Sequence, residues 1–242
     1  MDRWLQRTEM LIGREALERL ATSSVIVFGL GGVGSACTEA LARAGVGTLH
    51  LVDDDCVGET NLNRQLVATR SSIGQAKARA MAERVADINP ACHVVAHQTF
   101  FLPETADAFD FTAFDYVVDC VDTVTAKLAL IRAAKEAATP IISSMGTANK
   151  LDPTAFQVAD IEKTSICPLA RIIRKEARKR RLGHFKVVFS TEPPLNPTQP
   201  SDLASELREG SSARSLPGSI SFVPPVAGFI LASEVVRDLA GV

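Results

Sequence analysis

The residue types best suited to chemistry in this sequence are an arginine, a lysine and an aspartate downstream of a glycine-rich turn. Arg64 and Lys77 supply cations. Arginine pairs with phosphate oxygens through two parallel hydrogen bonds, and lysine acts as a compact point charge. Asp53 directly follows an apolar run. At the end of a strand, a carboxylate can accept hydrogen bonds from both hydroxyls of a ribose. The combination indicates a site that holds and polarises the phosphates of a nucleotide.

The glycine-rich turn lies between two short apolar runs. Residues 25–28 and 49–52 are too short for helices, so we predict two buried parallel strands. A segment with helical periodicity follows the turn at 35–44. This order of strand, glycine turn, helix, strand and acid is typical of a nucleotide-binding βαβ unit, in which backbone N–H groups and a helix N-terminus face the phosphates. The glycines of the turn are Gly29, Gly31, Gly32 and Gly34.

A glycine turn alone leaves several kinds of protein open. It occurs most often in NAD- or FAD-binding proteins, and it can reflect tight packing only. A hydride-transfer enzyme, however, has no need of Arg64 and Lys77 at these positions. These cations favour a protein that handles a triphosphate over a dinucleotide-binding or nucleotide-sensing module without chemistry.

Length and composition limit the class of protein. The chain has 242 residues, of which 46% are hydrophobic, and a formal net charge of −2. This length suits one large α/β domain, or one domain with an appendage. The balance of charge excludes polyanion binding over the whole surface but not at a local patch. The five cysteines are odd in number and form no CxxC pair, which predicts reduced thiols without disulfides.

No segment predicts export or membrane insertion. The first ten residues lack the apolar run of a signal peptide. No stretch reaches the roughly 18 uninterrupted apolar residues that a membrane-spanning helix needs. We therefore expect a cytoplasmic protein that makes no contact with a membrane.

Three further apolar runs continue the alternation of strands and helices. Five strands with helical connections predict a Rossmann-like α/β fold, an open, mostly parallel sheet with helices on both faces. Ligands of such sheets bind beyond the carboxyl ends of the strands, where Asp53, Asp122 and Gly146 also fall. One site is predicted at that edge. The further predicted strands are 93–97, 116–119 and 141–144, and the predicted helices outside the βαβ unit are 8–20, 75–88 and 123–137.

The character of the chain changes after residue 149. We predict a C-terminal extension with short strands at 156–160 and 185–189, a helix at 168–182 and an apolar closing helix at 225–239. Residues 193–218 are rich in proline, serine and charge, which predicts a mobile segment. We expect residues 1–242 to form a single domain, with a nucleotide-binding half at 1–150 and a substrate-side half at 151–242.

The predicted helix at 168–182 is strongly basic. Seven cations fall within residues 171–181 and are opposed only by Glu176. A run of charge is most often a solvated face, but seven cations in a protein of net charge −2 exceed what solubility requires. Such a patch binds RNA phosphates with strong salt dependence and little reading of sequence. The residues predicted to contact nucleic acid are Arg171, Arg174, Lys175, Arg178, Lys179 and Arg181.

Four motifs resemble the ubiquitin-activating-enzyme-like superfamily, whose smaller bacterial, ThiF-like members activate a carboxylate by adenylation. They are the GLGGVG turn with Asp53, NxNRQ at 61–65, GxxK at 74–77 and DxxD at 119–122. The resemblance implies a single adenylating domain that uses ATP and Mg²⁺ and forms a homodimer. Adenylation places a carboxylate oxygen on the α-phosphorus and expels pyrophosphate. Its catalysis therefore needs cations and a metal around the phosphates rather than a general base.

The resemblance also implies roles for individual residues. The acid after the second strand holds the ribose, the Asn–Arg pair and the lysine contact the phosphates, and the second acid of DxxD, Asp122, coordinates magnesium. An N-terminal arginine, matched here by Arg7, reaches the triphosphate, in some members from the partner subunit. The implied catalytic residues are Arg7, Arg64, Lys77 and Asp122, and the implied nucleotide-binding residues are the four glycines of the turn, Asp53, Asn61, Asn63, Arg64, Lys77 and Asp122.

Two branches of the superfamily differ in their cysteines. Members that activate sulfur-carrier proteins usually bind a structural zinc through two CxxC pairs. Both pairs are absent here, so no structural zinc is expected. The chain instead resembles the tRNA threonylcarbamoyladenosine dehydratases, and Thr123 fits this branch because the sulfur-carrier branch has asparagine there. The matching segments include TNLNRQ at 60–65, LDPTAFQVADIEKT at 151–164, VVFSTE at 187–192 and GSISFVPPVAGFILASEVVRDL at 218–239.

The dehydratase resemblance implies a tRNA substrate that carries threonylcarbamoyl-adenosine. ATP activates the carboxylate of the threonyl side chain, and the ureido group of the same side chain closes a five-membered ring with net loss of water. The nucleophile belongs to the substrate, which agrees with a sequence that has no evident Cys–His pair. The alternative is an adenylating enzyme for the C-terminus of a sulfur-carrier or ubiquitin-like protein, with a sulfur-transfer or carrier protein as its partner.

Overall fold

The computed structural model describes residues 3–198 and 217–242. Within these residues, one sheet of seven strands has the order β3-β2-β1-β4-β5-β7-β6. Neighbouring strands pair in parallel, except that β6 and β7 are antiparallel. The strands are β1 (Ser24–Phe28), β2 (Thr48–Val52), β3 (His93–His97), β4 (Tyr116–Asp119), β5 (Ile141–Ser144), β6 (Phe156–Asp160) and β7 (Lys186–Ser190).

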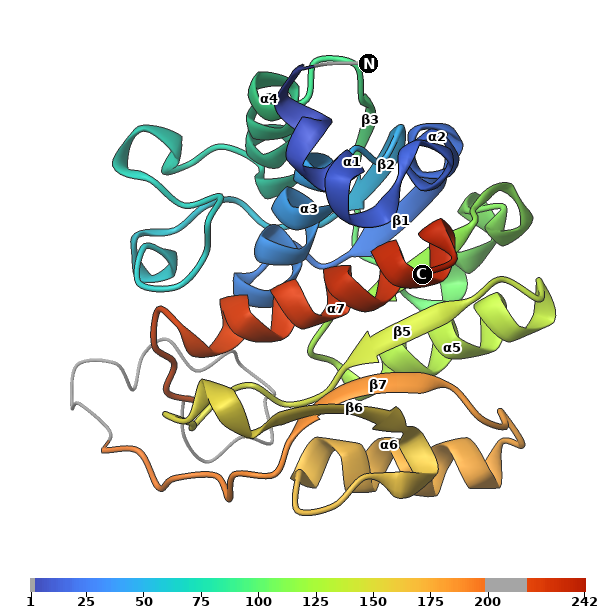
Figure 1. Ribbon diagram of the computed structural model, residues 1–242. Coiled ribbons are helices and arrows are strands. Elements are labelled where there is room, and N and C mark those ends of the chain that lie inside the picture. Colours follow the sequence, from blue (N-terminus) through green and yellow to red (C-terminus); the bar gives the residue numbers. More distant parts are fainter. Residues whose placement is uncertain (1–2, 199–216) are drawn as a thin grey trace.

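Helices cover both faces of the sheet (Figure 1). Side chains alternate between the faces along each strand, so Val25 and Val27 of β1 join one buried cluster while Ile26 and Phe28 join the other. The first cluster includes residues of α2, α3, α4 and α7, and the second includes residues of α5 and α6. The α-helices are α1 (Gln6–Ile12), α2 (Arg14–Thr22), α3 (Gly32–Ala44), α4 (Lys77–Ile88), α5 (Val124–Glu136), α6 (Pro168–Lys179) and α7 (Val223–Ala240).

The closing helix α7 packs directly on α3. A Cβ at Gly228 of α7 would lie 2.2 Å from the carbonyl oxygen of Val33, so the two helices approach closely enough to exclude a side chain there. At the start of α7, the Cβ of Pro224 lies 2.9 Å from the position a Cβ would take on Gly32. The last helix of the chain therefore holds the N-terminus of α3, where the glycine turn ends.

The structure confirms the predicted mostly parallel α/β sheet, and each predicted strand lies within one residue of its observed ends. The helix predicted at 8–20 is wrong in one respect, because it consists of two helices, α1 and α2. Gly13 separates them with φ +80° and ψ 166°, a conformation outside the helical region. The basic helix α6 ends at Lys179, three residues earlier than predicted, and Arg181 and Gly183 beyond it have positive φ.

Two other expectations concern parts of the chain outside these elements. Most of the segment expected to be mobile, 193–218, lies outside the described residues, which omit 199–216. Among the residues that are described, no helix has the length and apolar character needed to cross a membrane.

Candidate active site

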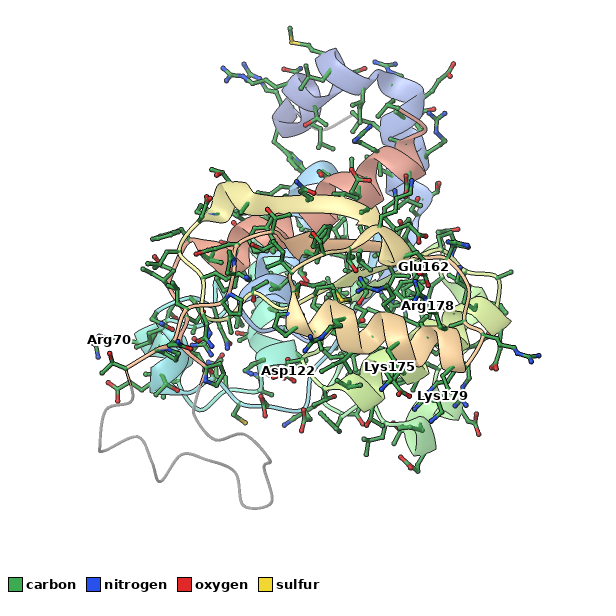
Figure 2. The ribbon with its side chains drawn as sticks, turned by 90° about the horizontal axis from the view of Figure 1, so that it is seen from below. Arg70, Asp122, Glu162, Lys175, Arg178 and Lys179 are labelled. Atoms are coloured by element: carbon green, nitrogen blue, oxygen red, sulfur yellow. The ribbon has the colours of Figure 1, made fainter. Side chains whose placement is uncertain are left out.

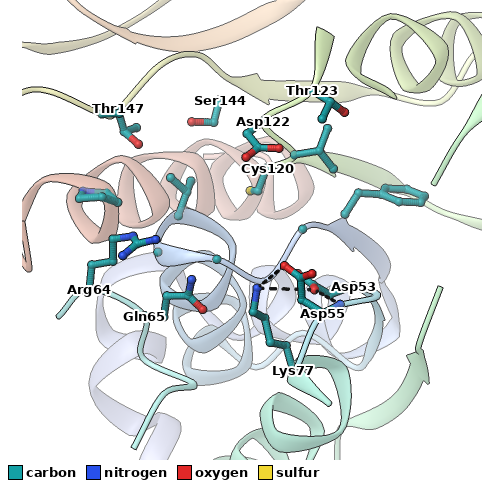
Figure 3. A pocket seen from close by; sticks show the side chains of 18 of the residues that line it. Asp53, Asp55, Arg64, Gln65, Lys77, Cys120, Asp122, Thr123, Ser144 and Thr147 are labelled. Atoms are coloured by element: carbon teal, nitrogen blue, oxygen red, sulfur yellow. Dashed lines mark hydrogen bonds and ion pairs between the residues drawn. The ribbon is translucent and has the colours of Figure 1, made fainter. Parts of the chain in front are cut away.

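A pocket of about 590 Å³ lies at the carboxyl ends of β1, β2, β4 and β5. The sheet order places β2 and β4 on opposite sides of β1, and ligands of open α/β sheets bind at such a point of reversal. Figure 3 shows side chains from the loops after these strands around one shared space. Of the residues with expected roles in nucleotide binding, the pocket brings together Gly29, Gly31, Gly32, Asp53, Asn61, Arg64, Lys77 and Asp122.

The glycine turn brings the backbone to the wall of this pocket. Gly29 has φ +85°, and a Cβ there would lie 2.9 Å from the backbone of Cys120. Gly34 does not line the pocket, and its role is packing, because a Cβ would lie 1.7 Å from the carbonyl oxygen of Gly29. Gly31 and Gly32 line the pocket where α3 begins. The first N–H groups of a helix lack intrahelical partners and attract anions, so this end of the pocket suits phosphate.

Asp53 is fixed by two backbone N–H groups. Its Oδ2 accepts a hydrogen bond from Leu30 at 2.6 Å, and its Oδ1 accepts one from Asp55 at 2.9 Å. Burial raises the pKa of Asp53, against the lowering effects of Lys77 and of these two hydrogen bonds. A carboxylate has about four acceptor sites, so Asp53 retains capacity for ribose hydroxyls.

Lys77 is a buried cation at the first turn of α4. Its Nζ lies 2.8 Å from Asp55 Oδ2 and 3.9 Å from Asp53 Oδ1, and only 7% of its side chain is exposed (Figure 3). The backbone N–H of Lys77 also donates to the carbonyl of Asp55 at 2.9 Å. The start of α4 is thus tied to the loop after β2, and the ammonium group is held at the pocket before a ligand enters.

Arg64 is positioned by its own loop. Its Nη1 donates to the carbonyl oxygen of Thr60 at 3.0 Å and to Asn63 Oδ1 at 2.8 Å. Burial lowers the pKa of the half-buried Arg64 guanidinium. Asn63 does not line the pocket, and its Nδ2 donates to the carbonyl of Ser219 at 3.1 Å. Asn63 therefore helps to orient Arg64, and its direct contact with a nucleotide stays a prediction.

Asp122 faces the pocket from the loop after β4, and no donor or cation pairs with it among the described residues. Below it, Lys127 Nζ lies 3.1 and 3.0 Å from the two carboxylate oxygens of Asp119, and both side chains are fully buried. Ser143 Oγ donates to Asp119 Oδ2 at 2.5 Å. Asp119 Oδ1 also accepts the backbone N–H of Val121 at 3.1 Å. This buried network fixes the turn that presents Asp122.

Two buried polar side chains at the site have no role assigned from the sequence. Lys127 completes the network described above, although nothing in the residue spacing connects it with Asp119. Gln65 lines the pocket and is 6% exposed, and its Oε1 has no hydrogen-bond partner within the described part of the chain. Its place directly after Arg64 in the NxNRQ motif is the signal that could have singled it out. Thr123 directly precedes α5, and its side chain makes no capping hydrogen bond.

The structure does not bring Arg7 to this pocket. Arg7 is exposed on α1 and is absent from the lining. Figure 2 shows the N-terminal helices at the opposite end of the molecule from Asp122. The same helix exposes 84% of Met10 and 87% of Leu11. Within one subunit, therefore, Arg7 does not act at the site formed by the other residues.

The cations of α6 fall into two groups. Arg174 Nη1 donates to the carbonyl oxygen of Thr164 at 2.7 Å and to its Oγ1 at 2.5 Å. Arg178 Nε lies 3.0 and 2.9 Å from the two carboxylate oxygens of Glu162, and this pairing lowers the pKa of Glu162. Both arginines therefore already have partners within the protein. Figure 2 shows Lys175 and Lys179 on the other side of the helix from Arg178, and these lysines make no ion pair with the described residues.

Comparison with known proteins identifies the family. The profile of the ThiF family matches residues 5–242. The chain belongs to the ThiF family. The tRNA threonylcarbamoyladenosine dehydratase of Bacillus subtilis is 45% identical over 238 residues, which cover 96% of this chain and 93% of that protein. Two crystal structures of the Escherichia coli tRNA N6-threonylcarbamoyladenosine dehydratase, one in complex with AMP and one with ATP, superpose on this chain with a TM-score of 0.86 each. The sequence identity is 34%, and the match covers 100% of this chain and 96% of the Escherichia coli chain.

These findings confirm the resemblance that the motifs predict. They also place the site described above within a ThiF-family fold, and one of the related crystal structures holds ATP. Among the described residues of this ThiF-family chain, no group of three or more His, Cys, Asp or Glu side chains could hold a metal ion. Magnesium in nucleotide sites is bound by one or two carboxylates together with phosphate oxygens. The unpaired carboxylate of Asp122 fits a magnesium ion of this kind.

Proposed function

We propose that this ThiF-family protein dehydrates the threonylcarbamoyl side chain of N6-threonylcarbamoyladenosine in tRNA, at the expense of ATP. The observation that best supports this is a pocket that brings together the N-terminus of α3, the cations Arg64 and Lys77 and the acids Asp53 and Asp122. The chain that forms it is 45% identical, over 96% of its length, to a dehydratase. Adenylyltransferases of the sulfur-carrier branch match less of it. The Aspergillus niger adenylyltransferase and sulfurtransferase is 32% identical over 55% of this chain.

In the first proposed step, a carboxylate oxygen of the substrate attacks the α-phosphorus of ATP, and pyrophosphate leaves. Arg64, Lys77 and the N-terminus of α3 neutralise the negative charge that shifts onto the phosphate oxygens. Asp53 holds the ribose and so fixes the α-phosphorus relative to the glycine turn. These groups position and stabilise charge, and none of them needs to exchange a proton with the substrate.

In the second proposed step, a ureido nitrogen of the same side chain attacks the activated carbonyl carbon. AMP leaves with the former carboxyl oxygen, the nitrogen loses its proton, and the nucleoside has lost one water in total. No protein nucleophile is required. Cys120 lies at the pocket wall, and burial raises its pKa well above the ordinary value, so it stays a neutral thiol.

Magnesium would be held by Asp122 together with the phosphates, and it would supply further positive charge to them. Asp122 is presented by a turn that Asp119 and Lys127 fix from below. The carboxylate therefore needs no rearrangement to meet a metal ion that enters with the triphosphate.

The surface proposed to bind the body of the tRNA is smaller than the six cations expected from the sequence. It consists of the exposed Arg171, Lys175, Lys179 and Arg181. Arg174 is left out because it donates to Thr164, and Arg178, although exposed, is left out because it pairs with Glu162. Because Leu169 at the start of α6 lines the pocket, RNA bound along this helix lies next to the site. Such a substrate would place the activity in the cytoplasm.

We also propose a homodimer in which Arg7 reaches the pocket of the other subunit. The support is the exposed position of Arg7 away from its own pocket, on a helix that exposes Met10 and Leu11. Apolar side chains exposed to this degree on one short helix are typical of a surface that is covered in an assembly.

The decisive experiment is mass spectrometry of nucleosides from threonylcarbamoylated tRNA after incubation with the protein, ATP and Mg²⁺. We expect the modified adenosine to lose the mass of one water, with AMP and pyrophosphate as the other products. Asp122→Ala should abolish this turnover while nucleotide affinity stays close to that of the wild type, because the ribose and phosphate contacts remain.

Formation of ADP and phosphate in place of AMP would contradict attack at the α-phosphorus. No mass change in the wild-type reaction would contradict the dehydratase proposal. In that case the protein should be tested for adenylation of the C-terminus of a carrier protein.

A further inference from the structure

The pocket has two ends with different chemistry. Phe28, Val52 and Asp53 line one end, and the loop after β5 lines the other with Leu169 of α6. Figure 3 shows Ser144 and Thr147 across the pocket from Asp53 and Lys77, with Asp122 on the same side as Ser144 and with Arg64 at the side. We call this second part the far end, and it consists of Ser144, Met145, Gly146, Thr147, Ala148 and Leu169.

The six residues of the far end are uncharged and supply both polar and apolar groups. Ser144 Oγ donates to the carbonyl oxygen of Met145 at 3.2 Å, so this hydroxyl group is already used as a donor. The hydroxyl of Thr147 makes no hydrogen bond with the described residues and is labelled at the pocket in Figure 3. Met145 and Leu169 add apolar surface. A ligand group that fits here is short, with a small apolar branch and at least one polar atom.

Gly146 is not explained by the protein around it. Its φ is not positive, and a Cβ would lie 3.6 Å from Cys167 Sγ and 3.7 Å from Leu169 Cβ, which are ordinary van der Waals distances. Gly29 and Gly34, by contrast, are required by a positive φ or by a close backbone approach. Neither conformation nor packing demands glycine at 146, and a side chain there would take up space in the pocket that this residue lines.

We infer that the far end, with Gly146 at its wall, is the binding site for the acyl group of the substrate, a carboxylate on a short branched polar chain. This inference rests on the proposed function and specifies where its substrate lies. A branched chain with a methyl and a hydroxyl group matches the apolar and hydroxyl surface of the far end. Its carboxylate would then face Arg64 and the phosphate-binding part of the pocket.

The position of α6 supports this assignment. Leu169 belongs to the first turn of α6 and lines the far end, and Lys175 lies exposed further along the same helix. A nucleoside whose RNA backbone lies along α6 therefore reaches the pocket from the far end. ATP occupies the opposite end, and the carboxylate of the acyl group meets the α-phosphorus between them.

Two glycines of the pocket allow a matched test. Gly146→Ala and Gly146→Val add one and three carbon atoms at the far end. Gly31→Ala adds one carbon where the phosphates bind, at a position whose Cβ would meet only Gln65 Nε2, at 3.9 Å. We expect Gly146→Ala to raise KM for threonylcarbamoylated tRNA about tenfold and Gly146→Val to raise it further, with KM for ATP unchanged. Gly31→Ala should raise KM for ATP and leave KM for the tRNA unchanged.

Binding without ATP separates the acyl group from the rest of the tRNA. Affinity is measured for tRNA with and without the threonylcarbamoyl group, for the wild type and both Gly146 variants, and thermal melting establishes that all are folded. The wild type should prefer the modified tRNA, and the variants should lose this preference while keeping their affinity for unmodified tRNA.

Equal loss of affinity for both tRNAs, or an unchanged KM for modified tRNA in both Gly146 variants, would overturn the inference. If the wild type does not dehydrate its substrate at all, the proposed function itself fails. The two failures are therefore distinguishable.

Discussion

The ion pair of Asp119 and Lys127 shows how single residues prepare this site before a ligand binds. Both side chains are fully buried, and the carboxylate also accepts hydrogen bonds from Ser143 and from the backbone of Val121. Removal of one partner of such a pair is costly because the other charge is left in a medium of low polarity. The network holds Asp122 at the pocket through the shared turn.

We predict that Lys127→Met lowers the free energy of unfolding by about 3–5 kcal/mol, because the Asp119 carboxylate loses its buried cation. The double variant Asp119→Asn/Lys127→Met should recover most of this loss, because no charge remains buried and asparagine can still accept the N–H of Val121. Urea unfolding at neutral pH measures both. Equal stability of Lys127→Met and the wild type would show that the pair contributes nothing.

At the scale of elements, α6 presents different charges on its different sides. Arg178 pairs with Glu162, while Lys175 and Lys179 are exposed on the other side of the helix (Figure 2). Each cation that neutralises an RNA phosphate releases counterions, and a cation that already pairs with a carboxylate gains less from a phosphate than one without a partner. The number of basic residues in the helix therefore overstates the number available to a tRNA.

For this reason we predict that Lys175→Ala/Lys179→Ala weakens tRNA binding and makes the slope of log K against log salt less steep by about 1–2. ATP affinity should not change. The control is Arg178→Ala/Glu162→Ala, which removes an internal ion pair without leaving a lone charge, and its salt slope should equal that of the wild type. Filter binding over a range of salt concentrations measures the slopes, and equal slopes for the two double variants would contradict the division of α6.

At the scale of the whole molecule, the position of Arg7 determines whether one subunit holds all the expected residues of its active site. Arg7 is exposed on α1, and the pocket is lined without it. If a second copy supplies this arginine, each active site of the homodimer combines residues of two chains. A two-fold symmetric dimer then has two such shared sites.

We predict that Arg7→Ala and Asp122→Ala are each inactive as pure proteins but regain activity when they are co-expressed. Random pairing gives about half heterodimers, each with one intact site of two, so about a quarter of wild-type activity is expected. Sedimentation should show a dimer for the wild type and both variants. An inactive mixture would exclude action of Arg7 across the interface.

The sequence alone determined the features that depend on local order. Short apolar runs define the seven strands, and the glycines after the first of them define the turn at the pocket wall, because strand burial and positive φ leave local marks in residue type. Asp53, Arg64 and Lys77 stand at the end of a predicted strand or in short motifs downstream of this turn, so their shared pocket could be predicted. The break at Gly13 was not foreseen, because the apolar stripe continues through it.

Only the tertiary structure decided which charges are available for function. The partner of Lys127 lies on β4, the partner of Arg178 lies between β6 and α6, and Arg7 is exposed and does not line the pocket. Each of these facts depends on how separate elements cross and pack, which local residue pattern does not encode. The same holds for Gly146, which only the folded chain places at the wall of the pocket.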